Sequence, residues 1–256
     1  MRLIFIFLSI FSISSYLHAQ NNAIAAGEKL VFTASYNMSG ILTDLAEVTM
    51  ETSEFKTSKA TLMRLKCTAA TYSKWDNFFK IRDLYESYVN PSNLTPYLYK
   101  RDINEGSYYK AMKYTYDHKT NKVKSVQTKK NNNVENKDVS IHSGTKDIVS
   151  TIYSIRLSDF KNMAKGTKKT FTIIFDREEI KGQFTYLGKE SISTAIGKKE
   201  CYKLAIGSNQ PDALQGTNSN FLWLTADENK IPVYGKFKIP VGNGELKIKS
   251  VSGLKN

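Results

Sequence analysis

The sequence is poor in the residues from which metal sites and reactive centres are most often built. It has only two cysteines and three histidines in 256 residues. His118 and His142 have no cysteine or carboxylate near them at the spacing of a zinc site. The sequence also lacks the Gly-x-Ser-x-Gly elbow of hydrolases and a glycine-rich phosphate-binding loop. We therefore predict no metal site and no cofactor, assign no catalytic residue, and rank an enzyme below a binding protein or an interaction module.

Two cysteines are too few for a disulfide framework, and the chain is long enough to bury a core without one. In an alternating run, Cys67 shares its side with Met63 and Leu65, which indicates a core position. Cys201 and Lys203 lie on the side of their strand opposite to the apolar residues. This difference weighs against a bond between Cys67 and Cys201, but the sequence leaves their pairing open.

Long apolar runs are scarce as well, and the conspicuous one extends from Leu3 to Phe11. Arg2 precedes this run and a serine-rich stretch leads from it to Ala19, so residues 1–19 have the three parts of a signal peptide. The run is too short to span a membrane. The residue directly after the cleavage point is not a cysteine, so a lipid anchor has no attachment atom. We therefore predict a single mature domain, residues 20–256, exported to the periplasm or the extracellular space, with neither a transmembrane span nor a lipid anchor.

Acidic residues are outnumbered by basic ones, which gives the chain a net charge of +13. The lysines are spread along the whole sequence rather than gathered in one segment. A distributed excess of lysine indicates either an anionic neighbour, such as a lipid headgroup or an acidic glycan, or a solvated surface without a specific partner. Export argues against nucleic acid as a partner, and the oligomeric state stays open.

Alternation of apolar and polar residues with a period of two dominates the rest of the sequence. Turn residues such as Asn90 and Pro91 separate the alternating runs. The runs predict strands at residues 30–38, 41–55, 60–72, 78–89, 94–103, 108–118, 122–128, 169–175, 179–188, 190–195, 199–207, 220–225, 231–239 and 245–251. So many strands predict a mainly β protein, in which a large curled antiparallel sheet approaches a half-open barrel. A twisted sheet split into two packed sheets is the alternative.

One segment, Thr145–Met163, changes to helical spacing, with Ser143 or Thr145 as N-cap candidates. Its apolar stripe contains Ile148, Val149, Ile152, Tyr153 and Ile155. We expect this single substantial helix to cover the curled sheet, and the polar loop from Lys129 to Gly144 to act as its hinge. A carboxylate introduced at Ile152 should then be buried and should destabilise the fold.

Aromatic residues are plentiful, and tyrosines concentrate in the central predicted strands. They either pack against one another across the sheet or line a cavity that takes an acyl chain or a glycan. On the second interpretation, the candidate ligand-binding residues are Tyr85, Tyr88, Tyr99, Tyr114, Tyr153 and Arg156. Arg156 is alternatively one half of a structural ion pair with Asp147 or with an acidic strand residue.

Two further expectations concern single segments. The large aromatic residues beside apolar strand faces should be mostly buried, namely Trp75, Phe78, Phe79 and Trp223. Asp176, Glu178 and Glu179 crowd one turn with Arg177, which indicates a solvated hairpin connection rather than an acid/base pair.

Several longer motifs resemble a known family. They are the block Trp75–Val89 followed by Leu94-Thr95-Pro96, the segment Asp147–Arg156, the pair Leu187-Gly188 with Thr194–Gly197, and the block Trp223–Val233. Together they resemble the exported bacterial family called domain of unknown function 3108, over most of the mature chain. The resemblance implies a mainly antiparallel β fold, related in shape to periplasmic lipoprotein carriers with a half-open barrel, and no known reaction. The family usually has an Ala-Gly step where this chain has Thr43–Ala46, so we expect an irregular first hairpin.

These observations favour an exported, non-enzymatic β-protein that binds or carries a component of the cell envelope, such as a lipid, lipoprotein or glycan. The alternative is an interaction module that supports an outer-membrane or surface assembly, and an envelope hydrolase ranks third. A large apolar cavity would favour the first function, whereas a filled barrel with an exposed aromatic patch would favour the second.

Overall fold

The computed structural model describes residues 21–256 except 39–40, 132, 209–218 and 240–241. The predicted signal peptide and the predicted turn Ser39–Gly40 therefore lie outside the described residues. Within them the chain forms fourteen strands, one α-helix and one turn of 3-10 helix. The elements are β1 (Lys29–Met38), β2 (Ile41–Lys56), β3 (Thr61–Thr71), η1 (Ser73–Trp75), β4 (Arg82–Val89), β5 (Pro96–Glu105), β6 (Tyr108–Asp117), β7 (Lys122–Lys129), β8 (Val134–Ser140), α1 (Ile148–Ile155), β9 (Lys168–Phe175), β10 (Glu178–Thr194), β11 (Gly197–Ser208), β12 (Phe221–Thr225), β13 (Pro232–Ile239) and β14 (Gly242–Ser252).

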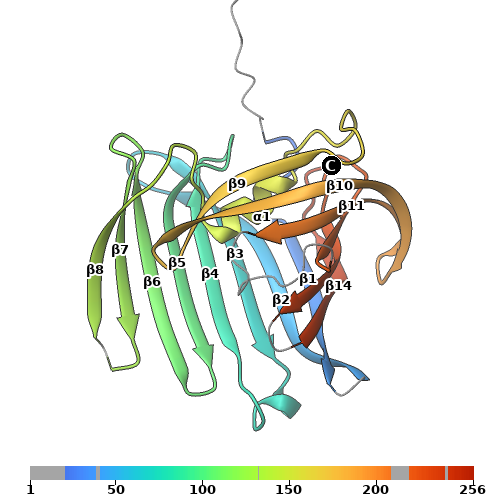
Figure 1. Ribbon diagram of the computed structural model, residues 1–256, viewed down its shortest axis with the longest axis horizontal. Coiled ribbons are helices and arrows are strands. Elements are labelled where there is room, and N and C mark those ends of the chain that lie inside the picture. Colours follow the sequence, from blue (N-terminus) through green and yellow to red (C-terminus); the bar gives the residue numbers. More distant parts are fainter. Residues whose placement is uncertain (1–20, 39–40, 132, 209–218, 240–241) are drawn as a thin grey trace, which may run out of the picture.

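All fourteen strands belong to one antiparallel sheet, in the order β8-β7-β6-β5-β4-β3-β2-β1-β14-β13-β12-β11-β10-β9. Strands that are consecutive in the sequence pair with each other, except that β8 and β9 form the two edges. The remaining pair joins β1 to β14, so the first and last strands of the chain meet in the middle of the sheet. The prediction of a mainly β fold built on one large curled antiparallel sheet is confirmed, and the sheet is not closed into a barrel (Figure 1).

One face of the sheet, here called the inner face, is covered by other parts of the chain. Leu30, Met50, Cys67 and Tyr85 lie opposite one another on this face across β1 to β4. The helix α1 packs against β3, β4 and β9. In Figure 1, β9 and β10 run across the green and cyan strands with α1 next to them. Alternate side chains of β3 and β4 therefore point into a packed interior, as the period of two requires.

The single helix is confirmed, but it is shorter than the predicted range. It begins at Ile148, after Asp147, whose carboxylate accepts a 2.8 Å hydrogen bond from the backbone N–H of Ser150. Asp147 is therefore the N-cap, in place of the expected Ser143 or Thr145. The helix ends at Ile155, beyond which the backbone continues in single turns.

The exposed side of α1 also differs from the expectation. Val149 and Tyr153 are buried, but the side chain of Ile152 is 38% exposed. Its expected burial is therefore wrong. The eight-residue helix is enclosed by the sheet on most of its circumference, and Ile152 lies on the side that remains open.

The polar stretch predicted to be a hinge contains β8. In this strand only Val139 is buried, so the sequence carries no apolar alternation there. β8 pairs with β7 alone and forms an edge of the sheet. Charged residues on an edge strand discourage pairing with other chains, which explains a strand of this composition.

Two irregularities interrupt the regular pairing. The predicted strands 179–188 and 190–195 are a single strand, β10, whose register with β11 shifts between Tyr186 and Gly188. Gly188 has φ +109°, a conformation that other residues rarely adopt. The register between β1 and β2 shifts between Ala34 and Ser35, in agreement with the expected irregular first hairpin.

The large aromatic residues divide into two groups. Trp223 is buried, at 5% exposure, as predicted. Phe78 and Phe79 are 77% and 47% exposed, and Trp75 is only partly buried, so the predicted burial of both phenylalanines is wrong. The reason is that β4 begins at Arg82, and the residues before it form a loop rather than a strand.

Both cysteines, Cys67 and Cys201, are free thiols.

Candidate functional site

Three of the candidate tyrosines lie on the inner face of the sheet and a fourth lies on α1. Tyr99 and Tyr114 are paired across β5 and β6, with ring centroids 5.5 Å apart, and Tyr85 belongs to the same face of β4. Tyr153 is fully buried on α1. Tyr88 points to the opposite face, where its ring packs edge-on against Phe55 with a centroid separation of 4.7 Å. The structure therefore brings Tyr99 and Tyr114 together and separates Tyr88 from them.

Tyr85, Tyr99, Tyr114 and Tyr153 are all protonated at neutral pH. Burial raises the pKa of Tyr85, Tyr99 and Tyr153 above their usual range, and it raises the pKa of Tyr114 to about 12. The hydroxyl of Tyr114 accepts a 2.9 Å hydrogen bond from the backbone N–H of Arg177. These side chains supply apolar ring surface and neutral hydroxyl groups, and none of them supplies a base.

The turn between β9 and β10 rests on this tyrosine surface. The guanidinium of Arg177 donates to Ser125 Oγ (3.0 Å) and to Glu135 Oε2 (3.0 Å), which ties the turn to β7 and β8. Asp176 forms ion pairs with Arg101 and, at 2.9 Å, with Lys110. The predicted hairpin is correct, and Asp176 and Glu178 are exposed as expected. Arg177 departs from the expectation, because its side chain is largely buried and its bonds fix the turn against the inner face.

The electrostatics of this turn agree with its position. Burial acts to raise the pKa of Asp176, but the hydrogen bonds and charges of Lys110 and Arg101 outweigh it and lower the pKa below the usual value. Asp176 and Arg177 have φ of 46° and 69°, which costs energy for residues other than glycine. The ion pairs offset this cost, so the turn is held in a defined position.

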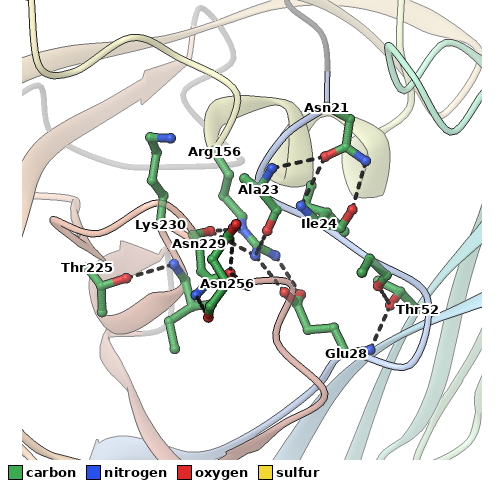
Figure 2. A network of polar contacts seen from close by, with 12 residues as sticks. Asn21, Ala23, Ile24, Glu28, Thr52, Arg156, Thr225, Asn229, Lys230 and Asn256 are labelled. Carbon is green, nitrogen blue, oxygen red and sulfur yellow. Dashed lines mark hydrogen bonds and ion pairs between the residues drawn. The ribbon is translucent and has the colours of Figure 1, made fainter.

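Arg156 is a structural residue. Its guanidinium binds both carboxylate oxygens of Glu28 at 2.6 Å and donates to the backbone oxygens of Asn229 (2.9 Å) and Ala23 (3.2 Å) (Figure 2). Arg156 and Glu28 are both almost completely buried. The network connects the end of α1 with the start of β1 and the β12–β13 turn. The expected structural ion pair of Arg156 is present, but its partner is neither Asp147 nor a strand residue: it is Glu28, which immediately precedes β1.

A different group of aromatic residues, of which three are exposed and Trp75 is partly buried, lies at the end of the sheet formed by the β1–β2, β3–β4 and β5–β6 turns. The β3–β4 loop, at the bottom of Figure 1, carries Trp75, Phe78 and Phe79, and the β5–β6 turn leads to Tyr108, which is 54% exposed. We call these four residues the aromatic rim. The exposed Ile41 of the β1–β2 hairpin and Leu42 lie at the same end of the sheet.

The loop that carries the aromatic rim is anchored at several points. The carboxylate of Asp76 accepts hydrogen bonds from Thr71 Oγ1 (2.6 Å) and from the guanidinium of Arg82 (2.6 Å). The Arg82 hydrogen bond is the main cause of the lowered pKa of Asp76. The indole N–H of Trp75 donates to the backbone oxygen of Asp44 at 2.9 Å. These bonds give the loop a defined shape although its tip is exposed.

The two phenylalanines occupy different positions on this loop. The ring of Phe79 lies over Gly106, so that a Cβ atom at Gly106 would be 3.5 Å from it, and the N–H of Gly106 donates to the backbone oxygen of Lys80 at 2.7 Å. Phe78 projects into solvent. Lys74 and Lys80, which flank the phenylalanines in sequence, are exposed as well. The sequence signal for this surface was the dipeptide Phe78-Phe79 next to Asp76-Asn77, which are turn formers.

The described residues offer no further evidence of a reactive centre. They contain no group of three histidine, cysteine or acidic side chains placed to hold a metal ion. Their one α-helix is far too short to cross a bilayer.

Comparison with known proteins identifies the fold but no activity. A family model described as protein of unknown function (DUF3108) matches residues 31–249. No curated protein matches the sequence. A β-barrel-like protein with a domain of unknown function, DUF1849, from Brucella abortus is similar in structure, with a TM-score of 0.57 and 7% identity over 89% of this chain and 97% of that chain. A protein with a YmcC-like fold from Bacteroides fragilis aligns with a TM-score of 0.37 and 8% identity over 90% of this chain and 97% of that chain.

Proposed function

The chain belongs to the DUF3108 family of proteins of unknown function, and on this premise we propose that it is an exported, non-enzymatic protein that binds the lipid surface of the cell envelope through its aromatic rim. The family supplies no reaction or ligand, so the proposal rests on the surface itself. The observation that carries it is the exposure of Phe78 and Phe79, at 77% and 47%, on an anchored loop.

The composition of the rim matches a membrane interface. Aromatic side chains are stable at the depth of lipid headgroups, where the ring is removed from water. Burying a phenylalanine side chain contributes about 1.5–3 kcal/mol. The exposed Lys74 and Lys80 lie beside the phenylalanines, and a lysine near an anionic lipid surface contributes about 1 kcal/mol. The net charge of +13 acts in the same direction.

The anchoring of the loop also supports docking. Trp75 and Asp76 are already held by hydrogen bonds to Asp44, Thr71 and Arg82. A surface that is ordered before binding loses little conformational entropy when it binds, so more of the apolar contact appears as affinity.

The inner face gives less support to the alternative of a carrier that encloses a lipid. The helix α1 packs on it, and the β9–β10 turn is tied across it by Arg177 and Asp176. An inner face covered by α1 and the β9–β10 turn, together with an exposed aromatic patch, favours contact through the surface.

Binding to vesicles tests the proposal. Mature protein should sediment with vesicles of phosphatidylcholine and phosphatidylglycerol, and less with phosphatidylcholine alone. The double variant Phe78→Ser/Phe79→Ser should bind at least about tenfold more weakly, because it lacks the two rings that the lipid surface would remove from water. Tyr97→Ser is the matched control, since Tyr97 is 41% exposed and begins β5 at the other end of the sheet.

The two tryptophans provide an independent signal. Bromine-labelled lipids should quench the fluorescence of Trp75, in the rim, and spare the buried Trp223. The proposal is wrong if the wild-type protein does not bind these vesicles, or if the double variant binds as well as Tyr97→Ser. Rim-dependent retention in envelope extracts without vesicle binding would indicate a protein partner instead.

Export is the second part of the proposal. It rests on the order of Arg2, the apolar run and Ala19, which is that of a cleavable signal. Mass analysis of the protein from its own host should find a chain that begins near Gln20. Retention of Met1 in a cytoplasmic pool would contradict it.

A further inference from the structure

A second surface feature lies at the end of the sheet opposite to the aromatic rim. It is a cleft of about 440 Å³ between the β4–β5 turn, the β6–β7 turn and α1 with the segment that precedes it. Asn93 and Thr95 line it from the first turn, His118 from the second and Ser154 from the helix. Connections alternate between the two ends of an antiparallel meander, which places these turns opposite to the β3–β4 loop. The volume lies within the range of about 300–1,000 Å³ that is typical of small-molecule sites.

The charged groups that line this cleft have one sign. Lys146 precedes α1 and Lys169 belongs to β9, so two separate elements each contribute an ammonium group. The Nε2–H of His118 is already donated to the backbone oxygen of Pro96 at 2.6 Å, so the further donors are the hydroxyls of the lining residues Thr95 and Ser143. None of the described residues that line the cleft is acidic. Such a surface is complementary to an oxyanion.

Lys146 is held in a fixed position in the wall of the cleft. Its ammonium group donates to the backbone oxygen of Leu94 at 2.6 Å and lies 3.5 Å from that of Asn93. An ammonium group has three N–H donors, so these two carbonyls leave at least one for another acceptor. Burial lowers the pKa of Lys146 to about 8, and a bound anion would favour the charged form.

Two acidic side chains close to Lys146 in the sequence or the fold, Asp147 and Glu179, accept hydrogen bonds from other residues of the chain. Asp147 is completely buried and accepts hydrogen bonds from Ser87 (2.6 Å) and from the N–H of Ser150. Glu179 accepts from the backbone N–H of His142 at 2.8 Å and from Thr145 Oγ1. Neither acidic side chain lines the cleft.

We propose that this cleft binds the oxyanion group, a phosphate or a carboxylate, of a small molecule, with Lys146 as the fixed charge and Lys169 as the second ligand. Lys169 is exposed, and its ammonium group has only a long contact of 3.4 Å with Ser158 Oγ, so it can turn toward a ligand. Leu157 and Pro96 supply apolar lining for the rest of the molecule. This site is separate from the membrane surface proposed for the aromatic rim.

Titration of the mature protein with inorganic phosphate, monitored by the amide resonances at constant ionic strength, tests the proposal. Saturable shifts should appear at residues 93–95 and 143–146, and chloride should not reproduce them. Lys169→Gln should weaken binding about tenfold, the loss of one charge-assisted hydrogen bond. Lys168→Gln is the matched control, because neighbouring residues of a strand point to opposite faces and Lys168 does not line the cleft.

The outcomes separate this site from the rim. Phe78→Ser/Phe79→Ser should bind phosphate as the wild-type protein does, even if it no longer binds vesicles. The proposal is overturned if phosphate gives no saturable shifts at these residues, or if Lys168→Gln weakens binding as much as Lys169→Gln. Lys146→Met is a second variant, with its melting temperature measured because it also removes the bond to the β4–β5 turn.

A final arm identifies the source of the anion. Glycerol 3-phosphate represents a soluble phosphate monoester, and phosphatidylglycerol vesicles present a lipid headgroup. If binding to these vesicles displaces glycerol 3-phosphate from the cleft, the oxyanion belongs to a lipid. If glycerol 3-phosphate stays bound on the vesicles, the cleft takes a free molecule.

Discussion

A single buried residue, Arg156, holds three segments of the chain together through its ion pair with Glu28 and its bonds to backbone oxygens. Arg156 connects α1 with the start of β1 and the β12–β13 turn, and both members of the pair are buried (Figure 2). Arg156→Met should lower the free energy of unfolding by about 3–5 kcal/mol, because Glu28 would be left buried without its partner. Urea unfolding at neutral pH measures this loss.

The matched control is Lys161→Met, which removes the exposed ion pair with Glu228. Exposed pairs are screened by water, so its unfolding midpoint should equal that of the wild-type protein. An Arg156→Met midpoint equal to the control would show that the buried pair is not an anchor of the fold.

A second residue-scale prediction concerns the carboxyl pair Asp83 and Glu105, beside the aromatic rim. Burial raises the pKa of both groups, and the nearby charge of Asp83 raises the pKa of Glu105 further. Arg101 and the backbone N–H of Asn104 only partly oppose this shift for Asp83.

Because these pKa values are higher in the folded chain than in the unfolded chain, the folded chain binds more protons above the ordinary carboxyl pKa. Stability should therefore fall as pH rises from about 4.5 through the raised pKa values. Glu105→Gln should remove part of this slope and stabilise the protein at pH 7. Thermal melts from pH 4.5 to 8 measure it, and an unchanged slope in the variant would contradict the assignment.

At the scale of elements, α1 offers a direct comparison between two of its faces. Val149 is buried against the sheet, whereas Ile152 is on the open side of the helix. Val149→Asp should destabilise the protein by several kcal/mol, because it buries a charge without a partner. Ile152→Asp should cost far less, because its carboxylate reaches water. Urea unfolding of both variants checks the assignment, and equal losses would mean that α1 is rotated from the described orientation.

Local patterns explain which elements were predictable. Alternation predicted most of the strands before β8 because one face is more buried than the other, as Leu30 and Phe32 of β1 illustrate. It missed β8, where Val139 is the only buried residue and pairing with β7 decides the conformation. It placed Phe78 in a strand because the following residues do alternate, although Arg82 is where pairing begins.

The site was less predictable than the fold because its contacts are distant in sequence. Arg177 looked like a solvated turn residue, yet its partners Ser125 and Glu135 lie 52 and 42 positions away. Arg156 was correctly considered for an ion pair, but Glu28 is 128 positions away. The periodicity of a single segment cannot reveal contacts of this kind, because they form only when the sheet curls and brings distant segments together.

At the scale of the whole molecule, the connectivity has one long-range junction between strands. Every strand pair is formed by consecutive strands except β1 with β14. The two ends of the described chain also touch, since Lys255 Nζ donates to the backbone oxygen of Asn21 at 2.9 Å and Asn256 Nδ2 to that of Asn22 at 3.2 Å. The curled sheet is thus open between its edge strands β8 and β9, which are consecutive in the sequence. It is continuous across β1 and β14, the first and last of the fourteen strands, because these two strands pair.

This arrangement predicts the behaviour of a circular permutant. Joining Asn256 to Asn21 through a short glycine-serine linker and opening the chain between Ser143 and Gly144, both exposed, keeps every strand pair. The β14–β1 pair then becomes a local hairpin, so the mean sequence separation of contacts falls. Folding rates rise as contacts become more local, and the permutant should therefore refold faster than the wild-type protein by stopped-flow fluorescence of Trp223. An equal or slower rate in a permutant with the native circular-dichroism spectrum would show that closure of β1 on β14 does not limit folding.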